Sequence, residues 1–174
     1  MYPFMLRDIL MWLAISEPKL FRAKWSETIH HEWMTALKRD HPTVNVAHIR
    51  NRMDQAVDDC LVEGYEPLIE GLSLPDPGDR HVLAAAIVCN ADVIVTDNLK
   101  DFPLEALEEY GIEAQSPDEF VRNLLDLSPA SVVSACNDAR INLKKPPFTE
   151  EEYLVRLEEL GLKETVRALR ALGK

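Results

Sequence analysis

The segment LPDPGDRHVLAAAIVCNADVIVTDNLKDF, residues 74–102, carries the pattern from which the fold class is predicted. Residues 79–89 are rich in Ala, Val, Leu and Ile, follow a Pro-Gly turn and end near Asn90, which predicts a largely buried helix. Residues 92–96, DVIVT, form a short β-branched run that is typical of an interior strand in a parallel sheet. The stretch therefore predicts a helix that leads directly into a strand.

The lengths of these two elements bring their far ends together. A helix of about eleven residues spans roughly 16 Å at about 1.5 Å per residue, and a strand of about five spans nearly the same at about 3.3 Å per residue. Asp79 at the helix start and Asp97 just past the strand end are therefore expected to meet at the carboxyl edge of the sheet. Open α/β sheets bind ligands at that edge.

Each of these aspartates also has a purely structural interpretation. Asp79 after Pro-Gly is a reasonable N-cap, and Asp97-Asn98 is a reasonable Asx-type turn. Considered together, two carboxylates held close repel each other unless a cation or a shared proton relieves them. The spacing thus favours a site for a hard metal ion, with the structural roles as the alternative.

The same stretch resembles the PIN-domain nucleases. The similarity rests on DRHVLAAA, residues 79–86, followed by VIVTDNLKDFP, residues 93–103, and it extends from Tyr2 to about Leu127 with a WSE segment at 25–27. The resemblance implies an α/β fold with a three-layer, mainly parallel sheet flanked by helices. It also implies a metal-dependent endoribonuclease, similar to the toxin of a bacterial toxin–antitoxin pair.

Glu32, Asp79 and Asp97 are the candidate catalytic and metal-binding residues. Position alone favours a boundary role for Glu32, paired with a Lys or Arg, whereas the resemblance matches it to the second acidic position of the PIN site. The resemblance implies that the three acids hold Mg²⁺ or Mn²⁺, hard cations that prefer oxygen ligands. The secondary candidates, as ligands or groups that orient them, are Thr96, Asn98, Asp101 and Asp76.

Other charged side chains have weaker patterns. His30 and His31 lack metal-ligand spacing, because no second His completes an H-E-x-x-H pattern, and we expect both at surface or boundary positions. Arg80 is assigned equally to a phosphate contact and to a solvent-facing position. Residues that bind substrate are not otherwise identified.

The resemblance also implies a first strand that carries a first catalytic Asp. This chain starts at Met1, where that strand should already have ended, and by analogy the strand would lie between the strands at 20–25 and 92–96. We expect either a natural protein that starts earlier or a degenerate member with a rearranged sheet. The earlier start is favoured because the other acids are kept, and Asp8, on the first helix, does not replace the missing one.

Periodicity and turn residues divide the chain into a PIN-like domain, residues 1–127, and a helical extension, residues 128–174. Thr149 and Glu152 form a capping box at the start of one helix of the extension. The predicted strands are 20–25, 67–71, 92–96 and 112–115. The predicted helices are 4–15, 26–39, 46–61, 79–89, 104–110, 117–127 and 129–143, one from 149, and one after Gly161 that ends near 172.

Composition is that of an ordinary globular protein, with 47% hydrophobic and 28% charged residues. No apolar run reaches the length of a membrane span, no signal peptide is visible and the three cysteines form no C-x-x-C pair, so we expect a cytoplasmic protein with reduced thiols. Residues 1–127 hold 11 basic and 23 acidic side chains, a charge of −12, and residues 128–174 hold 8 and 7, a charge of +1. A nuclease with this balance needs metal ions or a locally basic rim to bind a phosphate.

Two other functions stay open. One is a catalytically impaired PIN-like module that binds an antitoxin or dimerises, and the other is a Mg²⁺-dependent phosphatase or phosphoryl-transfer enzyme. P-loop, dinucleotide and serine-hydrolase motifs are absent from the sequence. The expected partners are RNA, an antitoxin protein and a second copy of the chain, without a membrane; the sequence specifies neither the RNA target nor the preferred metal.

Overall fold

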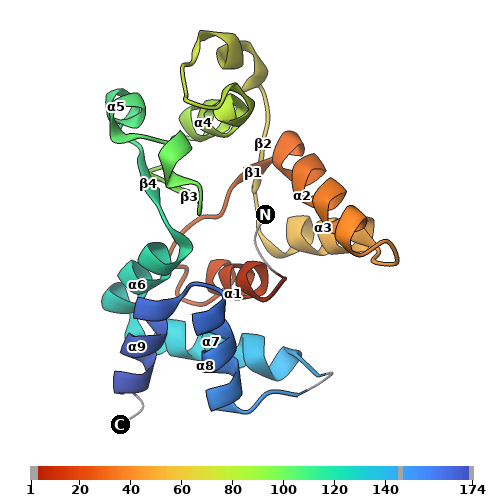
Figure 1. Cartoon of the computed structure of the whole chain (residues 1–174), viewed down its shortest axis with the longest axis vertical. Helices are drawn as coiled ribbons and strands as arrows, with labels where there is room; N and C mark the ends of the chain where they lie inside the picture. The colour runs from red at the N-terminus through yellow and green to blue at the C-terminus, as the bar shows by residue number, and fades with distance from the viewer. Residues whose placement is uncertain (1–3, 145–146, 173–174) are drawn as a thin grey trace. The chain divides into compact units, whose positions relative to one another are not determined.

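The computed structural model describes residues 4–144 and 147–172. The chain folds as two compact units, which Figure 1 shows with their helices and strands labelled. One unit comprises residues 23–116, and the other comprises the segments up to residue 22 and from residue 117. We refer to them as the acidic unit and the helical unit.

The acidic unit alternates short helices with very short strands. Residues 77–95 form a 3₁₀ turn, a helix and a strand, which agrees with the predicted helix and strand, although the helix is confined to residues 80–88. The elements of this unit are β1 Trp25–Ser26, α2 Glu27–Asp40, α3 Val46–Ala56, β2 Leu61–Val62, η1 Glu66–Gly71, η2 Pro77–Asp79, α4 Arg80–Val88, β3 Val93–Val95, η3 Leu99–Asp101, α5 Leu104–Leu107, η4 Glu108–Tyr110 and β4 Glu113–Gln115.

The strands of the acidic unit are parallel, which confirms the predicted α/β class with flanking helices. In β1 and β2, Trp25 pairs with Leu61, and in β3 and β4, Ile94 pairs with Ala114. Among the described residues the strands form two separate two-stranded sheets, β1-β2 and β3-β4, rather than one continuous sheet.

Three predicted elements of this unit were wrong. Residues 20–24 form no strand, and the pairing begins only at Trp25. Residues 67–71 lie in the 3₁₀ helix η1, because Pro67 near its start fixes φ and lacks the N–H that a strand ladder needs. The predicted helix 46–61 stops at Ala56, and a positive φ of 53° at Asp59 turns the chain into β2.

The core of the acidic unit surrounds α4. Leu83, Ala84 and Ala85 of this helix are buried, and the small alanines let it pack closely against η1, β1 and β3. Asp79 therefore lies at the start of a helix fixed by the core, and Thr96 follows the strand β3 that packs on the same helix.

The helical unit confirms the predicted helices at both ends of the chain. The capping box of Thr149 and Glu152 is present at the start of α8. Contacts pair α1 with α7, α6 with α7 and α9, and α8 with α9. The helices are α1 Phe4–Ala14, α6 Pro117–Leu127, α7 Pro129–Asn142, α8 Glu150–Glu159 and α9 Lys163–Leu172.

These contacts group the chain differently from the expected division at residue 127. Helices α1 and α6, which we assigned to the PIN-like domain, pack with the C-terminal helices, because their apolar stripes are buried against α7 and α9. None of the helices within the described ranges is both long and apolar enough to span a bilayer.

Candidate functional site

Three carboxylates of the acidic unit converge on one place. Asp76, Asp79 and Asp101 each offer an oxygen, and these atoms all lie within 4.8 Å of one another. Asp76 caps η2, where its Oδ1 accepts a hydrogen bond of 2.7 Å from the Gly78 N–H. A Cβ at Gly78 would lie 3.1 Å from the same oxygen, so glycine leaves room for this carboxylate. We call the three residues the acidic cluster.

The Asn98 amide connects two members of the acidic cluster. The Asn98 Nδ2 donates to Asp79 Oδ2 at 3.3 Å and makes a short hydrogen bond to Asp101 Oδ2. The Asn98 backbone N–H donates to Thr96 Oγ1 at 3.0 Å, which fixes the turn after β3. Of the secondary candidates, Thr96, Asn98 and Asp101 therefore share a hydrogen-bond network with Asp79, and Asp76 lies close to it.

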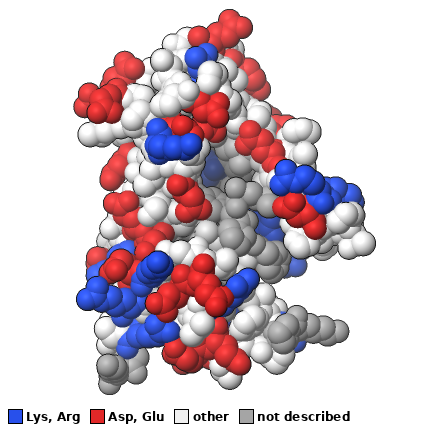
Figure 2. All heavy atoms as spheres, viewed as in Figure 1, with Lys and Arg blue, Asp and Glu red and all other residues white. Residues whose placement is uncertain are grey.

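The charges of the cluster act on Asp79. Burial raises the pKa of the Asp79 carboxyl, and the negative charges of Asp76, Asp101 and Glu32 raise it further, while His81 opposes them. A cation bound among these oxygens would relieve this repulsion. Figure 2 shows acidic side chains spread over the drawn face of the molecule, with basic side chains between them.

Glu32 reaches the site from α2 through a histidine. Its Oε1 lies 3.0 Å from His81 Nε2, although the two residues are 49 positions apart in the sequence. His81 was not among the predicted site residues. A signal for it exists in the sequence, because His81 is the one polar side chain in HVLAAAIV, a run that is otherwise apolar.

The remaining predicted residues lie outside the cluster. Asp97 is exposed and is not part of the three-acid group, so its role stays a prediction. Asp8 lies on α1, in the helical unit. Arg80 is half-buried, and its Nε is enclosed without a hydrogen-bond partner among the described residues.

His30 was expected at a surface or boundary position, and this was wrong. Its side chain is fully buried, with Nε2 at 2.8 Å from Asp54 Oδ1 and Nδ1 accepting from the Trp33 indole N–H at 2.9 Å. Because Nδ1 accepts, Nε2 carries the proton and donates to Asp54. Burial raises the pKa of Asp54, but hydrogen bonds from Trp25 and His30 outweigh it and leave the pKa lowered. His30 therefore anchors α2 to α3 and β1.

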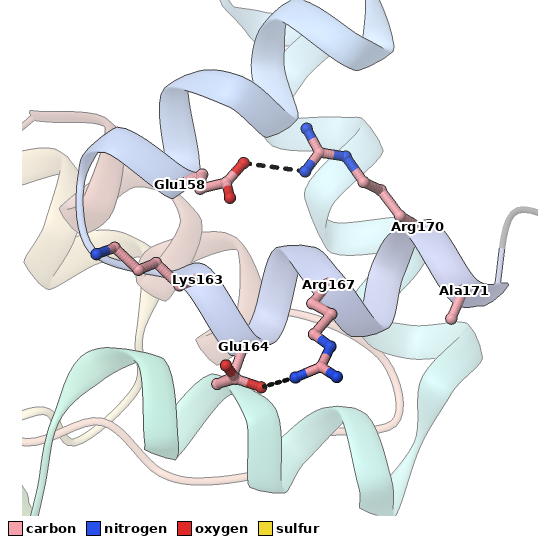
Figure 3. Close-up of a pocket in the computed structure, with 6 residues that line it drawn as sticks. All are labelled: Glu158, Lys163, Glu164, Arg167, Arg170 and Ala171. Carbon is pink, nitrogen blue, oxygen red and sulfur yellow. Dashed lines mark hydrogen bonds and ion pairs between the residues drawn. The ribbon is translucent and has the colours of Figure 1, made fainter.

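A pocket on the helical unit is a poorer candidate. Figure 3 shows Arg170 facing Glu158 and Arg167 facing Glu164. The Arg170 guanidinium lies 2.9 Å from Glu158, and that of Arg167 lies 3.4 Å from Glu164. Because these four side chains already form ion pairs, an incoming ion would gain little free energy by leaving water to bind in this pocket. It is lined by Glu158, Lys163, Glu164, Arg167, Arg170 and Ala171.

Short parallel strands flanked by helices agree with the fold that the PIN resemblance implies. Residues 117–171 match the family described as the VapC50 C-terminal domain. The chain is also 44% identical over 99 residues to the protein named "Putative ribonuclease VapC50" of Mycobacterium tuberculosis (strain ATCC 25618 / H37Rv). That alignment covers 55% of this chain and 56% of the relative, so the chain spans little more than half of the relative's length.

The two matches, to a VapC50 C-terminal domain and to a protein named as a putative ribonuclease, support the predicted resemblance to the PIN-domain nucleases. No solved structure gives a significant match. The family match begins at Pro117, where the contacts also begin the C-terminal part of the helical unit.

Proposed function

We propose that the chain is a metal-dependent endoribonuclease of PIN type and the toxin of a toxin–antitoxin pair. The observation that supports this most is the acidic cluster, in which Asp76, Asp79 and Asp101 place oxygens within 4.8 Å of one another. The likeness to a relative named as a ribonuclease supports the substrate class. An antitoxin protein and a second copy of the chain are the proposed partners, in the cytoplasm.

The residues present fit Mg²⁺ or Mn²⁺. The cluster is made of carboxylate oxygens alone, the donors that these hard cations prefer. Burial raises the pKa of Asp79, and the negative charges of Asp76 and Asp101 raise it further; a bound cation would offset this repulsion. A divalent cation bound there supplies Lewis acidity toward phosphate oxygens and lowers the pKa of a bound water.

The chain's own residues have distinct tasks in this proposal. Asp79 and Asp101 hold the cation, with Asp76 beside them, and the Asn98 amide keeps the first two carboxylates aligned. Glu32 adds a further negative charge near Asp79. Lys100, whose side chain is 82% exposed and whose Nζ lies 4.0 Å from Asp101, provides a positive charge at the rim for a phosphate.

The proposal is tested by Mn²⁺ calorimetry and cleavage of single-stranded RNA with the same samples. We expect Asp79→Asn and Asp101→Asn each to lower cleavage at least about 100-fold, because a metal ligand contributes several kcal/mol to the transition state. Asp92→Asn, an exposed acid of the same unit outside the cluster, is the matched control. Cleavage that survives in Asp79→Asn would overturn the proposal.

The resemblance and the geometry favour different metal ligands beside Asp79. The sequence selected Asp97 as a ligand, whereas the structure groups Asp101 with Asp79. We propose Asp101 as the principal ligand of the two. A larger loss of Mn²⁺ affinity in Asp97→Asn than in Asp101→Asn would reverse this assignment.

A binding module without activity is the second candidate. The exposed apolar side chains of Leu127, Val133 and Ile141 on α6 and α7 favour it, since such side chains are common where a partner binds. Light scattering of the purified chain and of Ile141→Lys would detect self-association through these helices. Metal binding without RNA cleavage, together with a dimer that Ile141→Lys disrupts, would favour this function over the nuclease.

A further inference from the structure

The Glu32 side chain is an exposed acid that contacts His81, two residues after Asp79, from a distant part of the sequence. It belongs to α2, and 56% of its side chain is exposed. A glutamate in this position samples several rotamers in water unless a partner holds it, since its long side chain loses considerable entropy when fixed. Its place near the acidic cluster therefore needs a specific contact.

His81 provides that contact from a rigid position. Its side chain is only 7% exposed and lies in the first turn of α4, next to the buried Leu83 and Ala84. The 3.0 Å contact from His81 Nε2 to Glu32 Oε1 joins α4 to α2. Because α4 begins directly after Asp79, the same contact holds Glu32 beside the end of the helix at which Asp79 lies.

Burial of the His81 imidazole costs free energy, because one ring nitrogen lacks a hydrogen-bond partner among the described residues. An ionised carboxylate only accepts hydrogen bonds, so His81 Nε2 carries the proton and donates to Glu32. Nδ1 is then an acceptor, and it is buried without a hydrogen-bond partner among the described residues. An apolar side chain of similar size would fill this place without leaving a buried polar atom unpaired. The bond to Glu32 is the one gain that a leucine there would not provide.

We infer that His81 is a positioning residue, which holds the Glu32 carboxylate toward Asp79 so that both face the same cation. The inference rests on the proposed function, because the cation is that of the nuclease site.

The test compares His81→Leu, His81→Gln and Glu32→Gln with the wild-type chain by Mn²⁺ calorimetry and by the KM and kcat of RNA cleavage. We expect His81→Leu to weaken Mn²⁺ binding about 10–100-fold, as loss of a group that orients a ligand does. Glu32→Gln should have the same effect, and the double variant Glu32→Gln, His81→Leu should add nothing. His81→Gln, whose amide still donates, should restore most of the affinity.

A readout without metal examines the contact itself. The ¹³C shift of the Glu32 side-chain carboxyl should change in His81→Leu, while that of the exposed Asp92 should not. His48→Gln changes an exposed histidine of the same unit and is the matched control. Circular dichroism shows whether each variant is folded, and His81→Gln decides the matter if His81→Leu is not.

The outcomes separate the two proposals. If Asp79→Asn loses Mn²⁺ but His81→Leu keeps it, His81 has no positioning role and the nuclease proposal stands. If the losses of Glu32→Gln and His81→Leu add in the double variant, or His81→Gln restores stability but not affinity, His81 is structural only. If the wild-type chain binds no Mn²⁺ and cleaves no RNA, both proposals are overturned.

Discussion

The acidic unit and the helical unit satisfy their backbone polar groups in different ways. In the helical unit, α6 to α9 pair their own backbone and bury apolar stripes, so charged side chains stay outside and pair there, as Arg170 does with Glu151 and Glu158. In the acidic unit the strands have two or three residues, and turns such as η2 and η3 carry the carboxylates. The clustered carboxylates of this chain therefore lie where its helices and strands are shortest.

The largest expected effects come from truncating one buried leucine in each unit. Leu83 on α4 and Leu157 on α8 are both fully buried, and we expect Leu83→Ala and Leu157→Ala each to cost about 2–5 kcal/mol in the free energy of unfolding. Only Leu83→Ala should also weaken Mn²⁺ binding, because its helix begins at Asp79. Urea unfolding and calorimetry measure the two effects. An equal loss of Mn²⁺ affinity in Leu157→Ala would mean that the units do not differ in this way.

A smaller loss of stability is expected when the Asp118 cap at the start of α9 is removed. Asp118 on α6 accepts hydrogen bonds of 2.9 Å from the backbone N–H groups of Glu164 and Thr165 at the start of α9. Asp118→Ala should cost about 0.5–2 kcal/mol, the range for the loss of an N-terminal cap. Asp118→Asn keeps one acceptor oxygen and should lie between. Thermal unfolding checks both, and an unchanged Tm in Asp118→Ala would contradict the capping role.

A buried hydroxyl gives a smaller effect of opposite sign. Tyr153 is 2% exposed, its hydroxyl has no hydrogen-bond partner among the described residues, and burial raises the pKa of its phenol. Tyr153→Phe removes this unpaired group and should stabilise the chain by up to about 1 kcal/mol, or about 2–4 °C in Tm. Tyr110→Phe, at an exposed site, should change little. A marked fall in Tm for Tyr153→Phe would reveal a partner for the hydroxyl.

The smallest expected effect is a change in Tm that depends on the charge of Asp79. Since the pKa of Asp79 is raised, the folded state binds this proton more tightly than the unfolded state, and that stabilisation is lost as the pH rises through the raised pKa. At neutral pH the ionised Asp79 therefore destabilises the metal-free fold. Asp79→Asn should raise the Tm slightly without metal, and the difference should shrink as the pH falls through the raised pKa toward about 4.

Metal should reverse the order of the two proteins. Mn²⁺ should raise the Tm of the wild-type chain and leave that of Asp79→Asn unchanged, because a ligand stabilises only the state that binds it. A Tm of Asp79→Asn below the wild-type value at neutral pH without metal would show that the Asp79 charge is already compensated in the fold.

Much of the fold followed from local signals. The helices of the helical unit have caps and apolar stripes that periodicity detects, as Thr149 and Glu152 show. Strands β1 and β2, with two residues each, carry no period at all, and they form because Trp25 meets Leu61 across the fold. Such pairings depend on tertiary contacts, which one sequence does not specify.

The candidate site was predictable in part. Asp79 was selected from its spacing, and Asp97 was chosen over Asp101 because it lies at the strand end. The 3₁₀ turn η3 brings Asp101 close to Asp79 and Asn98 joins the two, while the role of Asp97 stays a prediction. A turn of three residues has no sequence pattern strong enough to predict this proximity. His81 was missed because a polar residue in an apolar run is more often interpreted as part of the core.

The helical unit is built from both ends of the chain, and this affects how it is made. Leu6, Ile9 and Leu13 of α1 are buried, and α1 packs chiefly with α7. During synthesis at about 5–20 residues per second, α7 follows α1 by on the order of ten seconds. The acidic unit is complete on the ribosome within that interval, while the apolar stripe of α1 still lacks its cover. A nascent chain halted before residue 129 would therefore present α1 to chaperones.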